Sequence, residues 1–356
     1  MPRVSVLVAA YNAEPFIDQA LRSLQSQTFR DWEAIIVDDK STDGTLTRLQ
    51  EWQAREPRIR VFAHTANSGC GAARQTAFLH ANGEYCAVLD SDDVALPQWL
   101  QGRIACFDRR RSTVVVTGPM LRLHRDGSAA SEGRPAWSPS AYRWGLLFGN
   151  PVNDPACMFR TRVAADAGGY RTLRMAADWD LWTRLIEVGD IDEDPVLRIK
   201  YRIHEGSLCQ NEGKIRAGMQ PAACQIMSRT LVRLLGLELD PELAWYLFRD
   251  RPVFAGERHS AANAFAFLEA ALERFLRVFP EEPSGTLRLA VLRDVANVFR
   301  CGGWSPRRCL RMGVDLGRLE WRPSVVKLDL GTALAFLGCL GAPIVGRYHL
   351  WRLSKS

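Results

Sequence analysis

The sequence predicts an α/β fold, a doubly wound and mostly parallel sheet with helices on both faces, followed by a mainly α-helical C-terminal domain. Two observations support this fold class. Over residues 1–100, short apolar segments of β-compatible residues alternate with amphipathic helical segments, as in repeated β-α-β units. Beyond residue 207, apolar residues recur at helical spacing in segments interrupted by proline and glycine.

Strand and helix alternate regularly through the first hundred residues. The predicted strands are residues 4–10, 32–37, 58–63 and 85–89, and the helices between them end near Gln25, Trp52 and Asn82. Polar side chains follow each strand, namely Asn12, Asp38, Asp39, Asn67, Arg74 and residues 90–93. Because a doubly wound sheet binds ligands outside the carboxyl ends of its strands, we expect the site there.

Residues 83–93 contain the most informative candidate site, a cluster of aspartates after a strand. An interior-type strand runs directly into Asp90, Asp92 and Asp93, whose like charges repel one another unless a cation lies among them. Carboxylate oxygens suit Mg²⁺ or Mn²⁺, which keep positions open for diphosphate oxygens. The alternative is a solvated turn followed by a helix N-cap before Pro97.

Two common nucleotide-binding motifs are missing. The first turn is Ala9-Ala10-Tyr11-Asn12 rather than GxGxxG, which disfavours a hydride-transfer enzyme, and no GxxxxGK[ST] loop suggests an ATPase.

Four segments in register resemble a known family. Residues 4–12, 37–45, 67–74 and 89–93 occur in the order and spacing of the family 2 glycosyltransferases, inverting enzymes with the GT-A fold. The resemblance covers roughly the first 205 residues. It implies a glycosyltransferase domain over residues 1–207, with a nucleotide-sugar-binding half at 1–100 and an acceptor-binding half at 101–207, before a helical domain at 208–356.

The resemblance also implies a donor site. Its nucleotide-sugar-binding residues would be Ala10, Tyr11, Asn12, Asp38, Asp39, Asn67, Gly69, Arg74, Asp90, Ser91 and Asp92. Within it, Asp39 would bind the nucleotide base, and Asp90 and Asp92 would form the DxD motif at Mn²⁺ or Mg²⁺. Of these two metal-site residues, Asp92 rather than Asp90 is expected to be the direct ligand. Two residues depart from the family pattern: Lys40 stands where Gly or Asn is frequent, and Gln75 stands where Asn is frequent.

Residues 175–185 are similar to the family's ED-x-D-LW-x-RL element. The resemblance implies that Asp178 is the general base on the acceptor hydroxyl, although Ala177 replaces the preceding Glu. Asp180 is close enough in sequence to be confused with the base. The alternative is a helix N-terminus, where Asp is favoured for capping and dipole reasons.

Residues 200–207 resemble the family's YRxH-x-GS ending, which implies a contact of His204 with the metal or the diphosphate. Neutral imidazole suits Mn²⁺. The alternative is a structural histidine.

The C-terminal part contains apolar helical segments at 231–239, 243–248, 261–278 and 287–299. Residues 330–346 carry no charge and have basic and aromatic flanks, which fits either a shallow membrane anchor or a buried helix. From residue 287 to the end the sequence has 12 Lys and Arg but only 4 Asp and Glu, and the whole chain has a net charge of +6. This excess favours an anionic surface, and because no reader motif accompanies it we expect lipid and no nucleic acid.

The nine cysteines are scattered without zinc spacing, and no signal sequence precedes the first strand, so we expect reduced thiols and a cytoplasmic protein, peripheral on the inner membrane. We expect metal-dependent transfer of a sugar from a nucleotide diphosphate sugar, preferably a UDP-sugar, to a glycan or lipid-linked acceptor in cell-surface polysaccharide or lipopolysaccharide biosynthesis. Trp137 and Trp144 could stack on that acceptor or pack in the interior. The alternatives are a processive polysaccharide synthase and a non-catalytic scaffold with the same fold.

Overall fold

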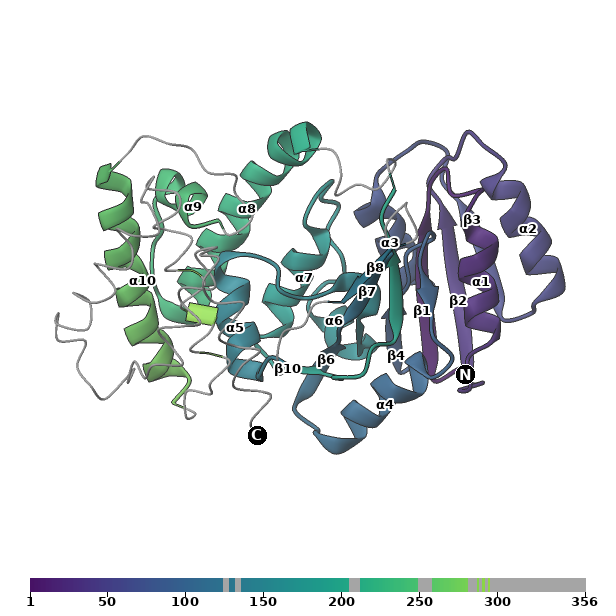
Figure 1. Cartoon of the computed structure of the whole chain (residues 1–356), viewed down its shortest axis with the longest axis horizontal. Helices are drawn as coiled ribbons and strands as arrows, with labels where there is room; N and C mark the ends of the chain where they lie inside the picture. Colours follow the sequence, from purple (N-terminus) through teal and green to yellow (C-terminus); the bar gives the residue numbers. More distant parts are fainter. Residues whose placement is uncertain are drawn as a thin grey trace. The chain divides into compact units, whose positions relative to one another are not determined.

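The computed structural model describes residues 1–123, 128–131, 136–204, 212–248 and 258–280, with residues 287, 290, 291 and 294 (Figure 1). The chain divides into two compact units. The first comprises Met1–Pro139 and Asn150–Ala222, and the second comprises Ser140–Gly149 and Ala223–Ser356.

A seven-stranded sheet in the order β10-β6-β9-β4-β1-β2-β3 forms the centre of the first unit. Its strands are β1 (Val4–Ala10), β2 (Trp32–Asp38), β3 (Ile59–Ala63), β4 (Tyr85–Val88), β6 (Thr113–Thr117), β9 (Met158–Arg160) and β10 (Asp190–Glu193). Strand β9 runs antiparallel to β4 and β6, and the other pairs are parallel. The predicted mostly parallel sheet is therefore confirmed.

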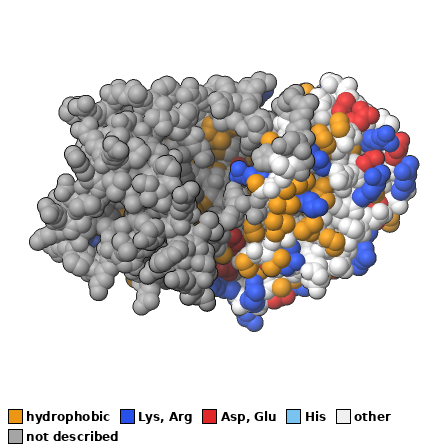
Figure 2. All heavy atoms as spheres, viewed as in Figure 1, with side chains coloured by type: hydrophobic (Ala, Val, Ile, Leu, Met, Phe, Trp, Pro, Cys, Tyr) orange, Lys and Arg blue, Asp and Glu red, His pale blue; other side chains and the backbone are white. Residues whose placement is uncertain are grey.

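The helices of the first hundred residues connect the parallel strands as predicted. They are α1 (Ile17–Gln25), α2 (Thr45–Arg55) and α3 (Cys70–Leu79), with α4 (Trp99–Arg109) next along the chain. Helices α1 and α2 lie side by side at the β3 end of the sheet (Figure 1). Their outer faces carry ion pairs one turn apart, Asp18 with Arg22 and Glu51 with both Arg48 and Arg55, and charged side chains gather at this end of the unit in Figure 2.

A second sheet, not predicted from the sequence, has the order β5-β11-β7-β8. Its strands are β5 (Val94–Ala95), β7 (Met120–Leu123), β8 (Ala129–Ser131) and β11 (Ile199–Arg202). Strand β11 pairs antiparallel with β5, which directly follows the acidic loop at residues 90–93. This pairing brings the end of β11 to the carboxyl end of β4.

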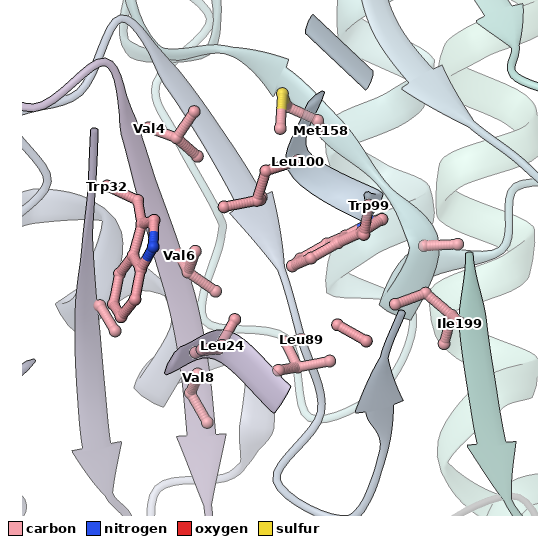
Figure 3. Close-up of a cluster of buried hydrophobic side chains, with 14 of the residues drawn as sticks. Val4, Val6, Val8, Leu24, Trp32, Leu89, Trp99, Leu100, Met158 and Ile199 are labelled. Atoms are coloured by element: carbon pink, nitrogen blue, oxygen red, sulfur yellow. The ribbon is translucent and has the colours of Figure 1, made fainter. Parts of the chain in front are cut away.

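The main core lies between the large sheet and α1 and α4. Figure 3 shows side chains that are far apart in the sequence in one apolar cluster, including Val6, Leu24, Leu89, Trp99, Leu100 and Ile199. All of these side chains are fully buried. The strands that end in the polar loops are therefore fixed in a close-packed core.

The remaining elements of the first unit are η1 (Asp154–Ala156), α6 (Thr161–Asp166) and α7 (Ala177–Leu185), and the other helices are α5 (Pro139–Phe148), α8 (Glu212–Leu235), α9 (Pro241–Leu247) and α10 (Arg258–Val278). Two of the four predicted C-terminal helical segments, 243–248 and 261–278, thus coincide with helices. The prediction for 231–239 was wrong at its end, because α8 ends at Leu235, where Gly236 adopts a φ of 61°. Most of 287–299 and all of 330–346 lie outside the described residues. In the part of the chain that is described, none of the helices has the length and apolar character needed to cross a bilayer.

Candidate active site

The predicted site residues lie where three neighbouring strands end. Ala10 ends β1, Asp38 ends β2, and Asp90 follows β4 after one further residue. Strands β2 and β4 both pair in parallel with β1, so their carboxyl ends open to the same edge of the sheet. The structure therefore brings the donor-site candidates together at the edge where a doubly wound sheet binds its ligand.

The loops after β1 and β2 are tied to each other through Asn12. Its backbone N–H donates to the Ser41 hydroxyl at 3.0 Å, and its side-chain oxygen accepts from the N–H of Thr42 at 2.8 Å. Asn12 itself has a φ of 49°, in the left-handed region that Asn tolerates better than most residues. The adjoining Tyr11 is 50% exposed, which leaves its ring open to a ligand.

The Asp39 carboxylate holds the loop before α3. It accepts hydrogen bonds from the backbone N–H groups of Ser68 at 2.9 Å and Gly69 at 2.7 Å, and its Oδ1 lies 2.7 Å from Nδ1 of His64. Asn67 donates to the Asp39 carbonyl oxygen at 3.2 Å. Asp39, Asn67 and Gly69 thus form one connected structure, and the sequence did not indicate the part that His64 plays in it.

Asp38 differs from Asp39 in having an unused acceptor. Its Oδ2 accepts from the N–H of Ser41 at 3.1 Å, while its Oδ1 is buried and finds no hydrogen-bond partner among the residues described. A buried acceptor without a partner is costly, so a donor group on a bound ligand would be favourable here.

The acidic loop after β4 meets two basic side chains from elsewhere. Arg74 on α3 donates from Nη2 to Asp90 Oδ1 at 2.6 Å, and Nε2 of His204 lies 2.8 Å from Asp92 Oδ2. Ser91, between the two aspartates, is nearly buried. Asp90 and Asp92 therefore have separate partners.

Asp93 has a structural role that the sequence did not show. Its Oδ1 accepts from the backbone N–H of Arg202 at 2.9 Å, and Nε of Arg202 donates to the Asp92 carbonyl oxygen at 2.9 Å. Burial raises the pKa of the Asp93 carboxyl to about 9, and the charges of Asp90 and Asp92 add to the effect. Burial and Asp90 also raise the pKa of Asp92, against the opposing effect of His204.

Asp154 on η1 also belongs to the site, although it is not among the predicted site residues. It forms an ion pair with Nη1 of Arg74, so the guanidinium bridges Asp154 and Asp90. Burial raises the pKa of Asp154 to about 8; Arg74 opposes the shift, and Asp178 and Asp90 add to it. The signal available in the sequence was an Asp in a polar turn, between Asn153 and Pro155, immediately before an apolar run.

The structure separates Asp178 from Asp180. Asp180 is 1% exposed and pairs with Arg184 at 2.7 Å and with Arg171 at 3.4 Å, so its carboxylate supports the fold. Asp178 is half-buried, and its Oδ2 accepts from Nδ2 of Asn150 at 2.7 Å. Burial raises the pKa of Asp178; Arg74 opposes this effect and Asp90 adds to it. These charge effects place Asp178 in the same electrostatic cluster as the acidic loop.

The backbone before Asp178 is tightly packed and strained. Ala176 has a φ of 60°, unfavourable for a residue with a Cβ. A Cβ added at Gly71 on α3 would lie 2.6 Å from the Leu173 carbonyl oxygen and 2.8 Å from the Ala177 Cβ. The start of α3 therefore contacts the segment that presents Asp178, at the position where the family resemblance places a Glu.

Comparison with known proteins identifies the family. Residues 5–166 match the model of Glycosyl transferase family 2. The Bacillus subtilis protein named "Putative glycosyltransferase EpsE" is 32% identical over 193 residues, which are 53% of this chain and 68% of that protein. The chain belongs to glycosyltransferase family 2.

A second relative is longer than this chain, and solved structures share its fold. Chondroitin synthase of Escherichia coli is 32% identical over 195 residues, which are 53% of this chain and 27% of that protein. The structure of S. aureus TarS 1-349 in complex with UDP-GlcNAc has a TM-score of 0.54 at 19% identity, covering 97% of this chain and 92% of that one. The similarity confirms the expected GT-A fold.

The two departures from the family 2 pattern have local structural settings. Lys40 has a φ of 64°, a conformation that Gly and Asn adopt at lower cost, which explains why those residues are frequent there. Gln75 lies on α3, and its Oε1 is buried without a hydrogen-bond partner among the described residues.

The donor set suits the divalent cation that the family resemblance implies. No group of three His, Cys, Asp or Glu side chains within the described ranges is placed to hold a metal alone. Asp92 and His204 nevertheless supply one carboxylate oxygen and one imidazole nitrogen that face each other, a combination that Mn²⁺ accepts when other ligands complete its coordination. Burial raises the pKa of both Asp92 and Asp93, and the neighbouring carboxylates of the acidic loop add to the shift, an effect of like charges that a cation would offset.

Proposed function

We propose that this family 2 glycosyltransferase performs inverting, metal-dependent transfer of a sugar from a nucleotide diphosphate sugar to a hydroxyl group of a glycan or lipid-linked acceptor. The observation that carries the proposal is the position of Asp178. Besides burial, which raises its pKa, the charges of Arg74 and Asp90 act on this carboxyl group, which supports one site shared by the base candidate and the DxD motif. A single site of this kind would hold the donor and activate the acceptor together.

The donor would lie along the strand ends. Tyr11 offers an exposed ring, Asp38 an unused buried acceptor, and Asp39 a rigid loop attachment beside Gly69. We favour a UDP-sugar, since TarS, which has the same fold, was solved with UDP-GlcNAc and with UDP. The full nucleotide-sugar site would comprise the predicted residues Ala10, Tyr11, Asn12, Asp38, Asp39, Asn67, Gly69, Arg74, Asp90, Ser91 and Asp92.

Asp92 and His204 would hold Mn²⁺ or Mg²⁺ at the diphosphate. The cation, when bound, would stabilise the negative charge that develops on the leaving phosphate. Arg74 keeps Asp90 in place beside this pair through the bond at 2.6 Å, and Asp154 holds Arg74 from its other side. Arg202 holds the backbone that carries His204.

Asp178 would act as the general base. Its carboxylate takes the proton of the acceptor hydroxyl as that oxygen forms a bond to the anomeric carbon from the face opposite the diphosphate. The bond from the anomeric carbon to the diphosphate oxygen breaks, and its electron pair leaves with the nucleoside diphosphate. One displacement inverts the anomeric centre.

The acceptor and cellular setting follow from relatives and from the charge of the chain. Chondroitin synthase, by its name, builds a glycan, and we propose a role in surface polysaccharide or lipopolysaccharide biosynthesis. Residues 1–207 would carry the reaction and 208–356 would form the helical domain, with 330–346 contacting the cytoplasmic face of the inner membrane. The basic C-terminal segment would favour anionic lipid.

A thermal-shift panel would test the donor site. UDP, GDP, dTDP and CMP are each added with and without Mn²⁺ or Mg²⁺, because a ligand that binds the folded state raises its apparent stability. We expect a metal-dependent shift with UDP, and UDP release from UDP-GlcNAc that Asp178→Asn removes. A shift without turnover in the wild type would favour the scaffold, and formation of long polymer would favour a processive synthase.

A further inference from the structure

Asn150 is the side chain that holds the Asp178 carboxylate. Its Nδ2 donates to Asp178 Oδ2 at 2.7 Å, a length typical of a hydrogen bond to a charged acceptor. The two residues are 28 positions apart and lie in the same compact unit. Asn150 stands in the loop between α5 and η1, and Asp178 in the first turn of α7.

The orientation of the Asn150 amide is determined by its second hydrogen bond. The backbone N–H of Val152 donates to Asn150 Oδ1 at 3.1 Å. Because an N–H requires an acceptor, the amide oxygen must face Val152, and the amino group must then face Asp178. The reversed amide would place a donor against a donor and an oxygen against a carboxylate.

This arrangement gives the two oxygens of Asp178 different roles. Oδ2 accepts from Asn150, and in the proposed mechanism Oδ1 would take the proton of the acceptor hydroxyl. Burial raises the pKa of Asp178, and Arg74 and nearby backbone N–H groups oppose this shift. A hydrogen bond donated to the charged form favours the ionised carboxylate in the same direction, and the Asn150 amide is placed to donate one. Loss of this hydrogen bond would let the carboxyl group rotate and would raise its pKa, so that more of it is protonated at neutral pH.

We propose that Asn150 is a positioning residue that orients the Asp178 carboxylate for proton abstraction; this inference depends on the proposed role of Asp178 as the base. Asn150 touches neither donor nor acceptor in this assignment and acts through Asp178. Replacing it should therefore change the pH dependence and the turnover number, and leave nucleotide binding unchanged.

Two variants separate orientation from structure. Asn150→Asp keeps the shape of the side chain and an acceptor for the Val152 N–H, but it removes the donor and adds a charge beside Asp178. Asn150→Ala removes both hydrogen bonds. Asn153→Ala is the matched control, because Asn153 lies in the same loop and donates to the Gly118 carbonyl oxygen at 3.0 Å.

The first readout is the titration of Asp178 itself, followed by carboxyl-carbon NMR of the full-length protein labelled at aspartate, with Asp178→Asn to assign its signal. Loss of one hydrogen bond to a charged acceptor should raise the titration midpoint by about one to two pH units in both Asn150 variants. Asn153→Ala should leave it unchanged. A midpoint that stays within about 0.3 units of wild type in both Asn150 variants overturns the inference.

The second readout is the rate of UDP release from UDP-GlcNAc with Mn²⁺ as a function of pH. The acidic limb should move upward by the same amount in the Asn150 variants, with the UDP-induced thermal shift unchanged. If Asp178→Asn releases UDP at the wild-type rate, the proposed base is wrong. If Asp178→Asn is inactive while both Asn150 variants keep the wild-type limb, the base assignment stands and the role of Asn150 is wrong.

Discussion

Nε2 of His204 lies 2.8 Å from Oδ2 of Asp92, although 112 residues separate the two in the chain. The end of β11 is fastened to the acidic loop by Arg202, which bonds to Asp93 through its backbone and to the Asp92 carbonyl oxygen through its side chain. Through Arg202, Asp93 thus fixes the backbone that places His204 beside Asp92.

This pair predicts how metal dependence will respond to mutation. Asp92→Asn should abolish the extra stabilisation that Mn²⁺ gives in the presence of UDP, and His204→Gln should reduce it. Wild-type protein at a ligand concentration of about 100 times Kd should gain about 2.7 kcal/mol, which thermal unfolding detects easily. His80→Gln is the control, because His80 stacks on Phe62. An undiminished Mn²⁺ effect in Asp92→Asn would remove Asp92 from the metal site.

The two aspartates of α7 should behave in opposite ways. Asp180→Asn deprives the buried Arg184 of its counter-charge and should lower the free energy of unfolding by about 3–5 kcal/mol. Asp178→Asn should abolish sugar transfer with little loss of stability, since the half-buried Asp178 has an uncharged partner in Asn150. Urea unfolding and UDP release, measured on both variants, check this. Equal stability losses would contradict the division of roles.

Gly69 should be needed for nucleotide binding because of its backbone. Its φ of 90° and ψ of 161° are open almost only to Gly, and an added Cβ would meet nothing within 4 Å, so Gly69→Ala introduces backbone strain of about 1–3 kcal/mol and no clash. The strain should weaken the Asp39 attachment and raise the Kd for UDP about tenfold. Gly168→Ala is a matched control, with the same φ and the same open space. Equal UDP affinities measured by calorimetry would show that the loop does not form the site.

Asp154 should make stability depend on pH. Burial raises its folded pKa to about 8 against the opposing charge of Arg74, so between its ordinary pKa and about pH 8 the folded chain binds more protons than the unfolded chain, and the ion pair with Arg74 forms fully only as pH rises. The resulting stability is complete below about pH 4 and is lost as pH rises through about 8. Asp154→Asn cannot titrate, so its free energy of unfolding should fall less steeply over this range.

Urea unfolding at several pH values between about 5 and 8 would measure that slope. Asp166→Asn is the control, because Asp166 is an exposed residue paired with Arg162 on the surface. Parallel curves for wild type and Asp154→Asn would show that Asp154 ionises normally.

Local sequence was sufficient for the family and for the parallel part of the large sheet, although not for the second sheet. The strands at 4–10, 32–38, 59–63 and 85–88 follow from apolar runs, and the intervening helices follow from their periodicity, because burial on both faces of a parallel strand leaves a continuous apolar signal. The polar residues after these strands could be assigned to one edge, since parallel connections bring the strand ends together. Their individual roles in donor binding remain predictions.

Tertiary structure alone decided the partners of the charged groups. Asn150 with Asp178, Asp154 with Arg74, and His204 with Asp92 are all distant pairs, and no local pattern in the chain specifies them. Tertiary structure also decided between roles that the sequence left open. Asp180, near the base candidate Asp178, is a structural ion-pair partner of Arg184. Trp144, a candidate for stacking on the acceptor, is fully buried and donates to Asp294. Burial and long-range contact set these outcomes, because the same side chain is a ligand or a support according to what the rest of the chain packs against it.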